Sequence, residues 1–524
     1  MWLSNTAKEN AVGYARTNTV CMVGASAVTV TVEASVFKSS SKGADTVRMS
    51  GLPDNVVNQA QTRVRSAMAN SALRFPDKSI SVNFAPASVP TTGSAADLAL
   101  AVTIMCADDL LPVERLADAV LLAELGLDGS LRAVPGTLPA LMEARRSGLK
   151  TAIVAPENAA EAAMVENLTI LAPRDLATLV AWVFGQTPLD PVPRPPTPEP
   201  PRLPDLSDVR GQPLARRALE IAAAGGHHML MIGPPGAGKT MLAERLPSIL
   251  PPLSDAEAVE VTSLHSLRGR FTGGAASLLH HAPFEAPHHS ITMQALVGGG
   301  AGNIGPGSLA LAHRGVLFID EAPEWPRSVL DSLRQPLESG EVRIRRANTA
   351  ISYPAKVTLV LAANPCPCAP NKPVDCTCPP LKRRSYLTRI SRPLMDRIDL
   401  RVYLPPVPPS AILTDITEAE PSGSVAKRVL RAREAAASRW SEAGEPWGLN
   451  SEVSGPALRS TRWRLPPPVR KYVDDLLLKE RITARGYDRV LKLAWTIADL
   501  REHDSPTADD VAEASELRLG YPLR

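Results

Sequence analysis

The sequence predicts an α/β protein whose central domain is built on a parallel β-sheet, and two stretches support this prediction. The first is 233–240, which reads G-x-x-x-x-G-K-T and lies between a short apolar run and a helical run from Met241 to Leu250. The second is the apolar run 316–319, which ends in two acids. Continuous apolar runs are typical of parallel strands buried on both faces. Acids that follow such a strand lie at the sheet edge where open α/β folds bind ligands.

The first stretch is predicted to be a phosphate-binding loop. Its glycines allow several backbone N–H groups to converge on one anion, and the following helix N-terminus adds partial positive charge. Lys239 is expected to contact the β- and γ-phosphates, and the Thr240 hydroxyl to hold Mg²⁺. The predicted nucleotide-binding residues are Gly233, Pro234, Pro235, Gly236, Ala237, Gly238, Lys239 and Thr240.

The second stretch supplies the carboxylates that such a site needs. Asp320 is expected to reach the Mg²⁺, and Glu321 to polarise the water that attacks the γ-phosphate. The two motifs together predict ATP and Mg²⁺ as cofactors and ATP hydrolysis as the reaction.

Length and composition set the frame for the whole chain. The 524 residues are too many for one hydrophobic core, so several domains are expected. The net charge is only +3, and any affinity for nucleic acid must therefore come from local patches. No apolar run approaches the roughly 18 residues of a membrane span, and the first residues do not resemble a signal peptide. We expect a cytoplasmic protein with no membrane partner.

Residues 1–186 are predicted to form an α/β or α+β domain. A proline-rich linker at 187–204, which disfavours helix, separates it from the ATPase core at 205–405. A helical lid is expected at 406–524. Within the first domain we expect strands at 27–34, 80–84 and 151–154, and helices at 55–71, 95–106 and 116–125.

The stretch between the two nucleotide motifs is about 75 residues long, more than one helix and one strand require. It contains 283–290 and the glycine-rich run 297–305. We interpret these as a mobile insertion that serves function, pore loops being one possibility. Its adjacent histidines, His288 and His289, lack the third ligand of a typical metal site.

A basic hairpin is predicted at 336–348. Its arginines, Arg343, Arg345 and Arg346, would contact DNA phosphates if the hairpin pointed into the channel of a ring. The alternative is a solvated basic edge that discourages aggregation.

Four of the six cysteines form two close pairs, Cys366 with Cys368 and Cys376 with Cys378. Four thiolates could hold a structural, tetrahedral Zn²⁺, although each pair has one intervening residue where zinc sites usually have two. Free or redox-active thiols are the alternative, because stable disulfides are rare in the cytoplasm.

The order of these motifs resembles the ComM/YifB family of Mg-chelatase-like AAA+ ATPases. The resemblance rests on 233–240, 283–290, 316–321, Asn364–Cys368 and Asp396–Asp399, and it extends over nearly the whole chain. It implies a hexameric ring that binds single-stranded or branched DNA and drives branch migration in recombination or natural transformation. Glu285 and Ser308 depart from the arginine and glutamate that the family usually carries there.

The resemblance also implies roles for residues outside the two motifs. Asn364 would orient the attacking water, and Arg397 would act as an arginine finger on a neighbouring subunit's ATP. The alternative for Arg397 is an ion pair with Asp396 or Asp399. Arg485 would reach the γ-phosphate, with Arg489, one helical turn further on, as the competing candidate.

The front of the chain resembles a Lon-protease-like domain, through 51–54, 63–67, 82–86 and 148–150. Ser94 lies near the place of the protease's serine, but Leu138 stands where its lysine would be, so peptidase activity is not expected. A protein-remodelling motor, as in magnesium chelatase, is the alternative function for the whole chain. Stimulation of ATP turnover by DNA would separate the two.

Overall fold

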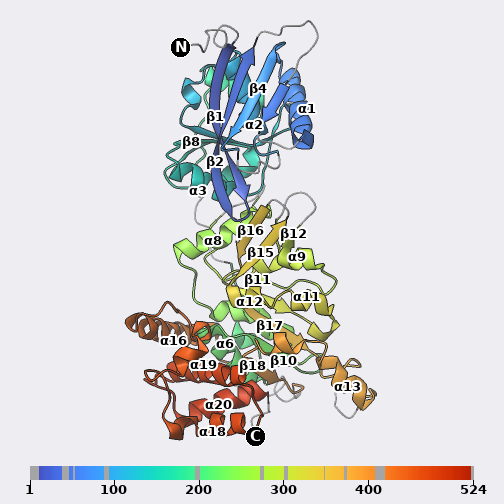
Figure 1. Cartoon of the computed structure of the whole chain (residues 1–524), viewed down its shortest axis with the longest axis vertical. Coiled ribbons are helices and arrows are strands. Elements are labelled where there is room, and N and C mark those ends of the chain that lie inside the picture. Colours follow the sequence, from blue (N-terminus) through green and yellow to red (C-terminus); the bar gives the residue numbers. More distant parts are fainter. Residues whose placement is uncertain are drawn as a thin grey trace, which may run out of the picture.

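The computed structural model describes residues 11–37, 47–50, 54–87, 94–194, 201–271, 277–299, 305–346, 349–370, 375–407 and 419–520. Figure 1 shows an N-terminal α/β part above the core, with the last helices packed on the core's lower side. Within the described ranges, no helix combines the length and apolar character that a membrane crossing requires.

The N-terminal part is a mixed sheet of seven strands in the order β3-β4-β2-β1-β5-β8-β9. A long antiparallel hairpin, β1 with β2, is its centre, and parallel strands extend it on the β5 side. The strands are β1 (Ala11–Val23), β2 (Ser26–Phe37), β3 (Val47–Ser50), β4 (Ser79–Ala85), β5 (Ala119–Leu122), β8 (Thr151–Val154) and β9 (Thr169–Leu171); β6 (Glu124–Leu125) pairs with β7 (Leu131–Arg132). The helices are α1 (Asp54–Asn70), α2 (Asp97–Ala107), α3 (Thr137–Arg146), α4 (Ala159–Ala162) and α5 (Leu176–Val183).

One predicted helix of this part is wrong. Residues 116–125 form β5 and β6 instead of a helix. All four residues of β5 are buried, because the strand lies between β1 and β8 with cover on both faces. Such a strand has no alternation of polar and apolar residues, so a short apolar run cannot be told from a buried helix by its periodicity.

The core is a sheet of five parallel strands in the order β11-β14-β17-β10-β18. Successive side chains of β10 face opposite sides: Met229 and Met231 pack in one hydrophobic cluster and Leu230 in the other. The strands β10 and β14 are therefore apolar throughout, as the sequence predicted. The strands are β10 (Met229–Ile232), β11 (Phe284–Glu285), β14 (Val316–Ile319), β17 (Thr358–Ala363) and β18 (Leu400–Tyr403).

Helices cover both faces of this sheet and small hairpins extend from it. They are α6 (Pro213–Gly225), α7 (Lys239–Arg245), α8 (Asp255–Ser266), α9 (Met293–Val297), α10 (Ser308–Leu311), α11 (Arg327–Asp331), α12 (Pro336–Ser339), α13 (Pro380–Leu387) and α14 (Arg392–Met395). The hairpins are β12 (Gly298–Gly299) with β13 (Gly305–Pro306), and β15 (Glu341–Arg346) with β16 (Thr349–Pro354).

Two interpretations of this region need correction. The stretch 283–290 is not wholly an insertion, because Phe284–Glu285 is β11, the edge strand that pairs with β14. The predicted hairpin at 336–348 begins later than expected, since Pro336–Ser339 is α12, whose proline occupies the first turn of the helix. Positions 300–304 and 347–348 of these predictions lie outside the described residues.

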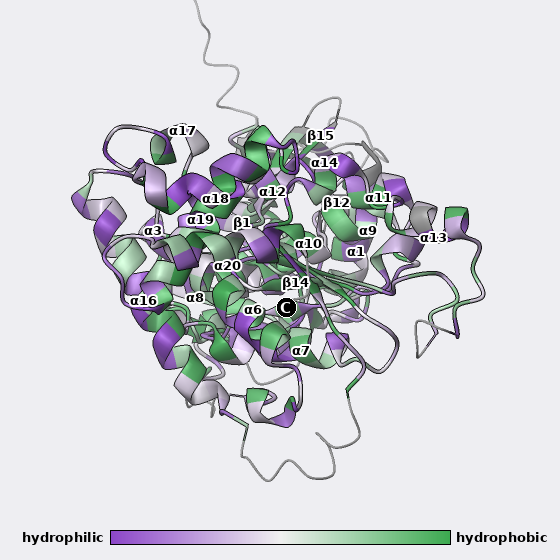
Figure 2. Ribbon diagram, turned by 90° about the horizontal axis from the view of Figure 1, so that it is seen from below, coloured by the Kyte–Doolittle hydropathy of each residue, from purple (hydrophilic) through white to green (hydrophobic). Residues whose placement is uncertain are grey.

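The C-terminal part is helical, with α16 (Ser422–Glu442), α17 (Gly455–Leu458), α18 (Pro467–Leu478), α19 (Ala484–Leu500) and α20 (Ala508–Leu519). Thr483 and Thr507 begin α19 and α20 by accepting hydrogen bonds from backbone N–H groups that the first turn leaves unpaired. Helices at the rim, such as α16, alternate hydrophilic and hydrophobic residues, consistent with one face packed and one in water (Figure 2).

The N-terminal part docks on the core through a polar contact and a close backbone approach. The buried Glu161 carboxylate accepts a hydrogen bond from the Ser266 hydroxyl at the end of α8, and Gly136 N donates to Ser266 O at 3.0 Å. Gly24, at the tip of the β1–β2 hairpin, lies against Ile351 of β16. A β-carbon at this glycine would stand 2.3 Å from a methyl group of Ile351, so the approach requires the absent side chain.

A buried carboxylate joins the helical lid to the core. Asp399 precedes β18 and is fully buried; its Oδ1 accepts from Arg489 Nη1 of α19 at 2.7 Å and its Oδ2 from the His228 backbone N–H at 3.1 Å. His227 Nδ1 lies 3.5 Å from the same carboxylate. Burial alone would raise the pKa of Asp399, but the charge of Arg489 and the contact with His227 hold it well below its ordinary value.

We expect Asp399→Asn to destabilise the chain by about 3 kcal/mol, because it leaves the Arg489 guanidinium without its buried counter-charge. Urea unfolding at pH 7 measures the loss. Since the folded pKa lies below the ordinary 3.8, the stabilisation is complete above that pH and is lost as the pH falls through the folded value. The difference in unfolding free energy between the wild type and Asp399→Asn should therefore narrow only at acid pH. Asp396→Asn is the matched control, and an equal loss there would contradict the assignment.

Candidate nucleotide site

The phosphate loop joins β10 to α7 at the carboxyl edge of the core sheet. Gly236 and Gly238 have φ values of 73° and 87°, in the left-handed region that favours glycine, and no atoms lie within 4 Å of where their β-carbons would be. Gly233 has a different reason to be glycine, since a β-carbon there would stand 2.7 Å from Leu404 O. The loop therefore leaves open space beside the first turn of α7, as a bound phosphate chain requires.

Lys239 lies at the centre of this edge. Its Nζ donates to Gly233 O at 2.7 Å, to Pro234 O at 3.0 Å and to Asn364 Oδ1 at 3.0 Å. Burial lowers the pKa of Lys239, while Asp320 and Glu321 act in the opposite direction. The structure thus brings together the lysine of the loop after β10 and the asparagine that follows β17, and phosphate oxygens could replace the loop carbonyls as partners of the ammonium group.

The acidic pair follows β14, two strands from β10. Thr240 Oγ1 donates to Asp320 Oδ2 at 3.2 Å, so two oxygen ligands suited to Mg²⁺ face each other. Glu321 is exposed and has φ 48°, an uncommon conformation for a non-glycine residue. Trp325 Nε1 donates to Asp320 O at 2.9 Å and closes the turn that holds this conformation. These residues fit ATP with Mg²⁺.

The arginines predicted to sense the γ-phosphate lie at the other end of the sheet. Arg489 is bound to Asp399, which precedes β18 and is level with His228 before β10. The phosphate loop follows the opposite end of β10, about 16 Å away along the strands. Arg485 is exposed at the start of α19 and makes no hydrogen bond or ion pair within the described chain. Arg489 is therefore committed to the fold, whereas Arg485 is available to a ligand.

Arg397 belongs to the same arginine group. It is 8% exposed, donates through Nη1 to Pro393 O at 2.6 Å and pairs with Glu338 through Nη2. Its ion-pair partner is therefore Glu338 and neither of the aspartates that the sequence suggested. Burial lowers the pKa of Arg397, and the charges of Arg334 and Arg485 lower it further. Sequence reasoning missed Glu338 and Arg334, because no motif marks contacts between α12 and the segment before β18.

The basic hairpin carries two exposed arginines on one face. Arg343 and Arg345 are two residues apart on β15 and share a face, whereas Val342, which precedes them and is buried, packs into the core. Arg346, the third arginine of the prediction, is the last residue of β15. Arg343 is in an ion pair with Glu341, which also accepts from Ser352 Oγ at 2.6 Å. The hairpin is thus basic, and one of its two exposed arginines is held in an ion pair.

The four clustered cysteines come together as predicted. Their sulfur atoms all lie within 4.8 Å of one another, at the surface between β17 and α13. The contact with Cys378 lowers the pKa of the Cys368 thiol to about 6. The predicted histidine pair is not part of this cluster: His288 hydrogen-bonds Ser290 Oγ at 2.8 Å, and its ring lies tilted against that of His289, with centroids 4.0 Å apart. In the N-terminal part, Ser94 donates to Glu124 and Leu138 is buried.

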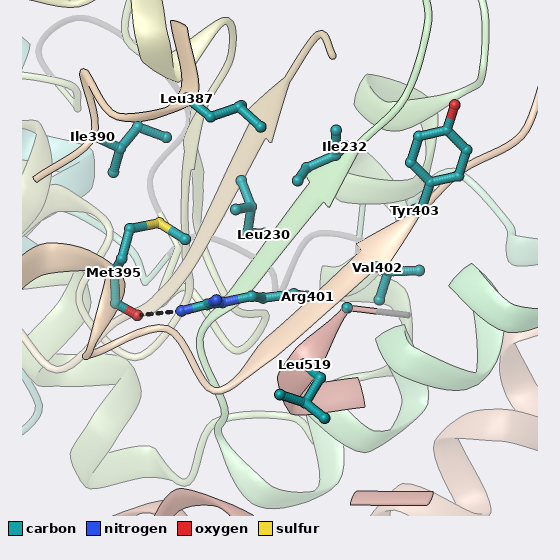
Figure 3. Close-up of a pocket in the computed structure, with 10 residues that line it drawn as sticks. Leu230, Ile232, Leu387, Ile390, Met395, Arg401, Val402, Tyr403 and Leu519 are labelled. Carbon is teal, nitrogen blue, oxygen red and sulfur yellow. Dashed lines mark hydrogen bonds between the residues drawn. The ribbon is translucent and has the colours of Figure 1, made fainter. Parts of the chain in front are cut away.

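A separate apolar pocket of about 210 Å³ lies beside β18 (Figure 3). Leu230 and Ile232 of β10 and Leu387 of α13 line it, and the Arg401 guanidinium donates to Met395 O at 3.3 Å. None of the phosphate-loop residues contributes to this lining. The pocket is therefore distinct from the nucleotide site.

Comparisons with known proteins agree with this geometry. Three family models match: subunit ChlI of Mg-chelatase over 36–158, magnesium chelatase subunit ChlI over 205–412, and the subunit ChlI C-terminal model over 419–518. An uncharacterized protein of Mycobacterium tuberculosis is 43% identical over 96% of this chain and 98% of its own length. YifB of Escherichia coli is 38% identical over 96% of both chains, and competence protein ComM of Haemophilus influenzae 38% over 95% of both.

The parallel sheet, the phosphate loop and the acidic pair opposite Thr240 define a P-loop ATPase of the AAA+ class. The identity to YifB and ComM over almost the full length narrows the class. The chain belongs to the ComM/YifB family of magnesium-chelatase-like AAA+ ATPases. The magnesium-chelatase 38 kDa subunit of Cereibacter sphaeroides is a more distant relative, 28% identical over 30% of this chain.

The roles of the two lid arginines, Arg485 and Arg489, can be distinguished by experiment. Arg485→Ala should lower ATP turnover at least tenfold with little change in the unfolding midpoint, because the side chain has no partner to lose. Arg489→Ala should lower the unfolding midpoint, because it removes the counter-charge of Asp399. Steady-state ATPase assays and thermal unfolding of both variants make the comparison. Full ATP turnover in Arg485→Ala would contradict its predicted role.

Proposed function

We propose that this chain hydrolyses ATP at sites shared between neighbouring copies of itself in a ring, and that the ring is a hexamer acting on DNA. One observation carries the shared site: the phosphate loop with Glu321 lies at the carboxyl edge of the sheet, while Arg397 and Arg485 lie at the amino edge. One chain therefore holds both halves of a site at positions that cannot meet on the same nucleotide. A head-to-tail ring unites them.

In the proposed site, one subunit binds ATP and its neighbour supplies the arginine that promotes hydrolysis. Mg²⁺, when bound with ATP, would neutralise charge between the phosphates; Thr240 and Asp320 are the residues that would hold it. Lys239 fixes the phosphate chain, Asn364 orients the water and Glu321 polarises it. Arg397 of the adjoining copy would have to exchange Glu338 for the γ-phosphate, which makes hydrolysis depend on the contact between subunits.

Mixing two inactive variants tests the shared site. Lys239→Ala and Arg397→Ala should each lose ATP turnover by two orders of magnitude or more. In a mixture, an Arg397→Ala subunit supplies Lys239 and a Lys239→Ala neighbour supplies Arg397. Equal amounts should therefore recover up to about a quarter of wild-type turnover, because about a quarter of random interfaces are complete.

The control mixes Lys239→Ala with Glu321→Gln. Both changes lie in the same half of the site, so no interface is complete and no recovery is expected. Failure of the first mixture to recover, with mixed oligomers verified by native mass spectrometry, would overturn the shared site. The same mass measurement tests the hexamer.

DNA is the substrate that we propose for the ring, with single-stranded or branched DNA as the preferred form. The exposed arginines Arg343 and Arg345 on one face of β15 support this, as a row of cations suited to phosphates. The name of the relative in Haemophilus influenzae, competence protein ComM, supports a role in natural transformation. Branch migration would follow from coupling ATP hydrolysis to movement of the hairpin along DNA.

DNA binding should depend on salt through these arginines. Arg343→Ala combined with Arg345→Ala should weaken DNA binding and reduce the slope of log K against log [salt] by about two. DNA should no longer raise ATP turnover, while basal turnover is kept. Fluorescence anisotropy over a salt series measures this, with Arg74→Ala, an exposed arginine in the N-terminal part, as the control.

A protein partner is the second candidate for the ring. The ion pair of Arg343 with Glu341 supports it, because it reduces the charge that the hairpin offers to phosphates, and the likeness to a magnesium-chelatase subunit adds weight. Unchanged DNA affinity in the double variant would favour this alternative.

A further inference from the structure

The four-cysteine cluster is not part of the nucleotide site, yet its geometry is specific. The Cys366 and Cys368 sulfurs are 3.4 Å apart, and those of Cys366 and Cys376 3.6 Å; Cys368 and Cys376 are separated by 3.7 Å. A disulfide requires about 2.05 Å, so these are not bonded pairs. Four sulfurs placed tetrahedrally around Zn²⁺ at about 2.3 Å are about 3.8 Å apart. The observed separations are close to that value.

The backbone at the first cysteine pair is folded into a tight turn. The Ala369 N–H donates to Cys366 O at 3.1 Å, so Cys366 and Cys368 lie within one four-residue turn. Cys366 is buried while the other three sulfurs lie towards the surface, so one side of the cluster is sheltered and the other gives an ion a path of entry.

The cluster lies in the segment that connects Asn364 to α13, so an ion bound there would restrain both. Cys366 comes two residues after Asn364, and Cys378 two residues before α13. At the other end of α13, Tyr386 is buried and Arg389 Nη1 donates to Glu324 Oε2 at 3.2 Å and to Pro323 O at 3.3 Å. The turn 322–324 that receives these contacts directly follows Glu321. The segment 365–379 is thus the direct covalent link from Asn364 to a helix seated beside the catalytic glutamate.

The helix itself extends to the periphery of the core (Figure 1). Its outer face is exposed: Leu381 is 80% accessible, and Lys382 and Arg383 are exposed beside it. A helix of eight residues with so little burial at its start depends on its flanking segments for position. The two cations follow Cys378 by four and five residues in the chain, and they would offset part of the net charge of −2 that one Zn²⁺ with four thiolates carries.

We propose that Cys366, Cys368, Cys376 and Cys378 bind one Zn²⁺ through four thiolates, and that this ion fixes α13 and the turn after Glu321 relative to Asn364. Binding forms four Zn–S bonds and releases up to four thiol protons to solvent, with no change of oxidation state. With all four positions filled by protein, the site is structural and leaves none for substrate. The zinc would hold two catalytic residues from different strands in register without touching ATP.

Metal analysis of the purified full-length chain tests the site. We expect about one zinc per chain in the wild type, and in Cys21→Ala, which removes a buried thiol outside the cluster. Cys368→Ser with Cys376→Ser should reduce the zinc to a small fraction of that. After chelation, added Co²⁺ should give the intense visible absorption of tetrahedral thiolate cobalt.

Hydrogen exchange tests what the ion holds. Chelation of the wild-type chain should speed amide exchange in 364–370, in α13 and in the turn 322–324, and leave α19 and α20 unchanged. Because this uses unaltered protein, it stands even where the serine variants fold poorly. Folded wild-type chain that contains no zinc and gives no thiolate cobalt spectrum, or that carries disulfides among these cysteines after preparation under reducing conditions, would overturn the proposal.

Discussion

All five strands of the core sheet point in the same direction, and the functional layout depends on this constraint. Because the strands are parallel, the loops after β10, β14 and β17 meet at one edge and deliver Lys239, Asp320 and Asn364 to one place. The same alignment sends the segment before β18 to the opposite edge. A single topological fact therefore builds a nucleotide site and separates it from the arginines that would complete it.

The lid packs on this sheet through a shared hydrophobic cluster, and a buried ion pair lies at the contact. Asp399 has no access to solvent, and its carboxylate is stable there because Arg489, the His228 N–H and His227 surround it. Arg485, one turn earlier on α19, is placed by this anchor but does not share in it. The ion pair of Arg489 therefore also fixes where Arg485 lies, and the proposed contact of Arg485 with a neighbouring subunit's nucleotide depends on the position of the lid.

Much of this arrangement was predictable from the sequence, for identifiable reasons. The phosphate loop and the acids after β14 are local patterns whose spacing fixes their geometry, so Lys239 and Asp320 were found directly. The error at 116–125 arose because a strand covered on both faces looks like a buried helix. The partner of Arg397 could not be found, since Glu338 is 59 residues away along the chain and only packing brings it near. The same holds for the commitment of Arg489 to Asp399.

The tip of the β1–β2 hairpin rests on β16 without room for a side chain at Gly24. The basic hairpin is consequently not free to move alone, because its second strand, β16, contacts the N-terminal part. Any movement of that hairpin would either carry the N-terminal part with it or shift the contact between Gly24 and Ile351. The N-terminal part would then limit the range and the rate of the hairpin's movement.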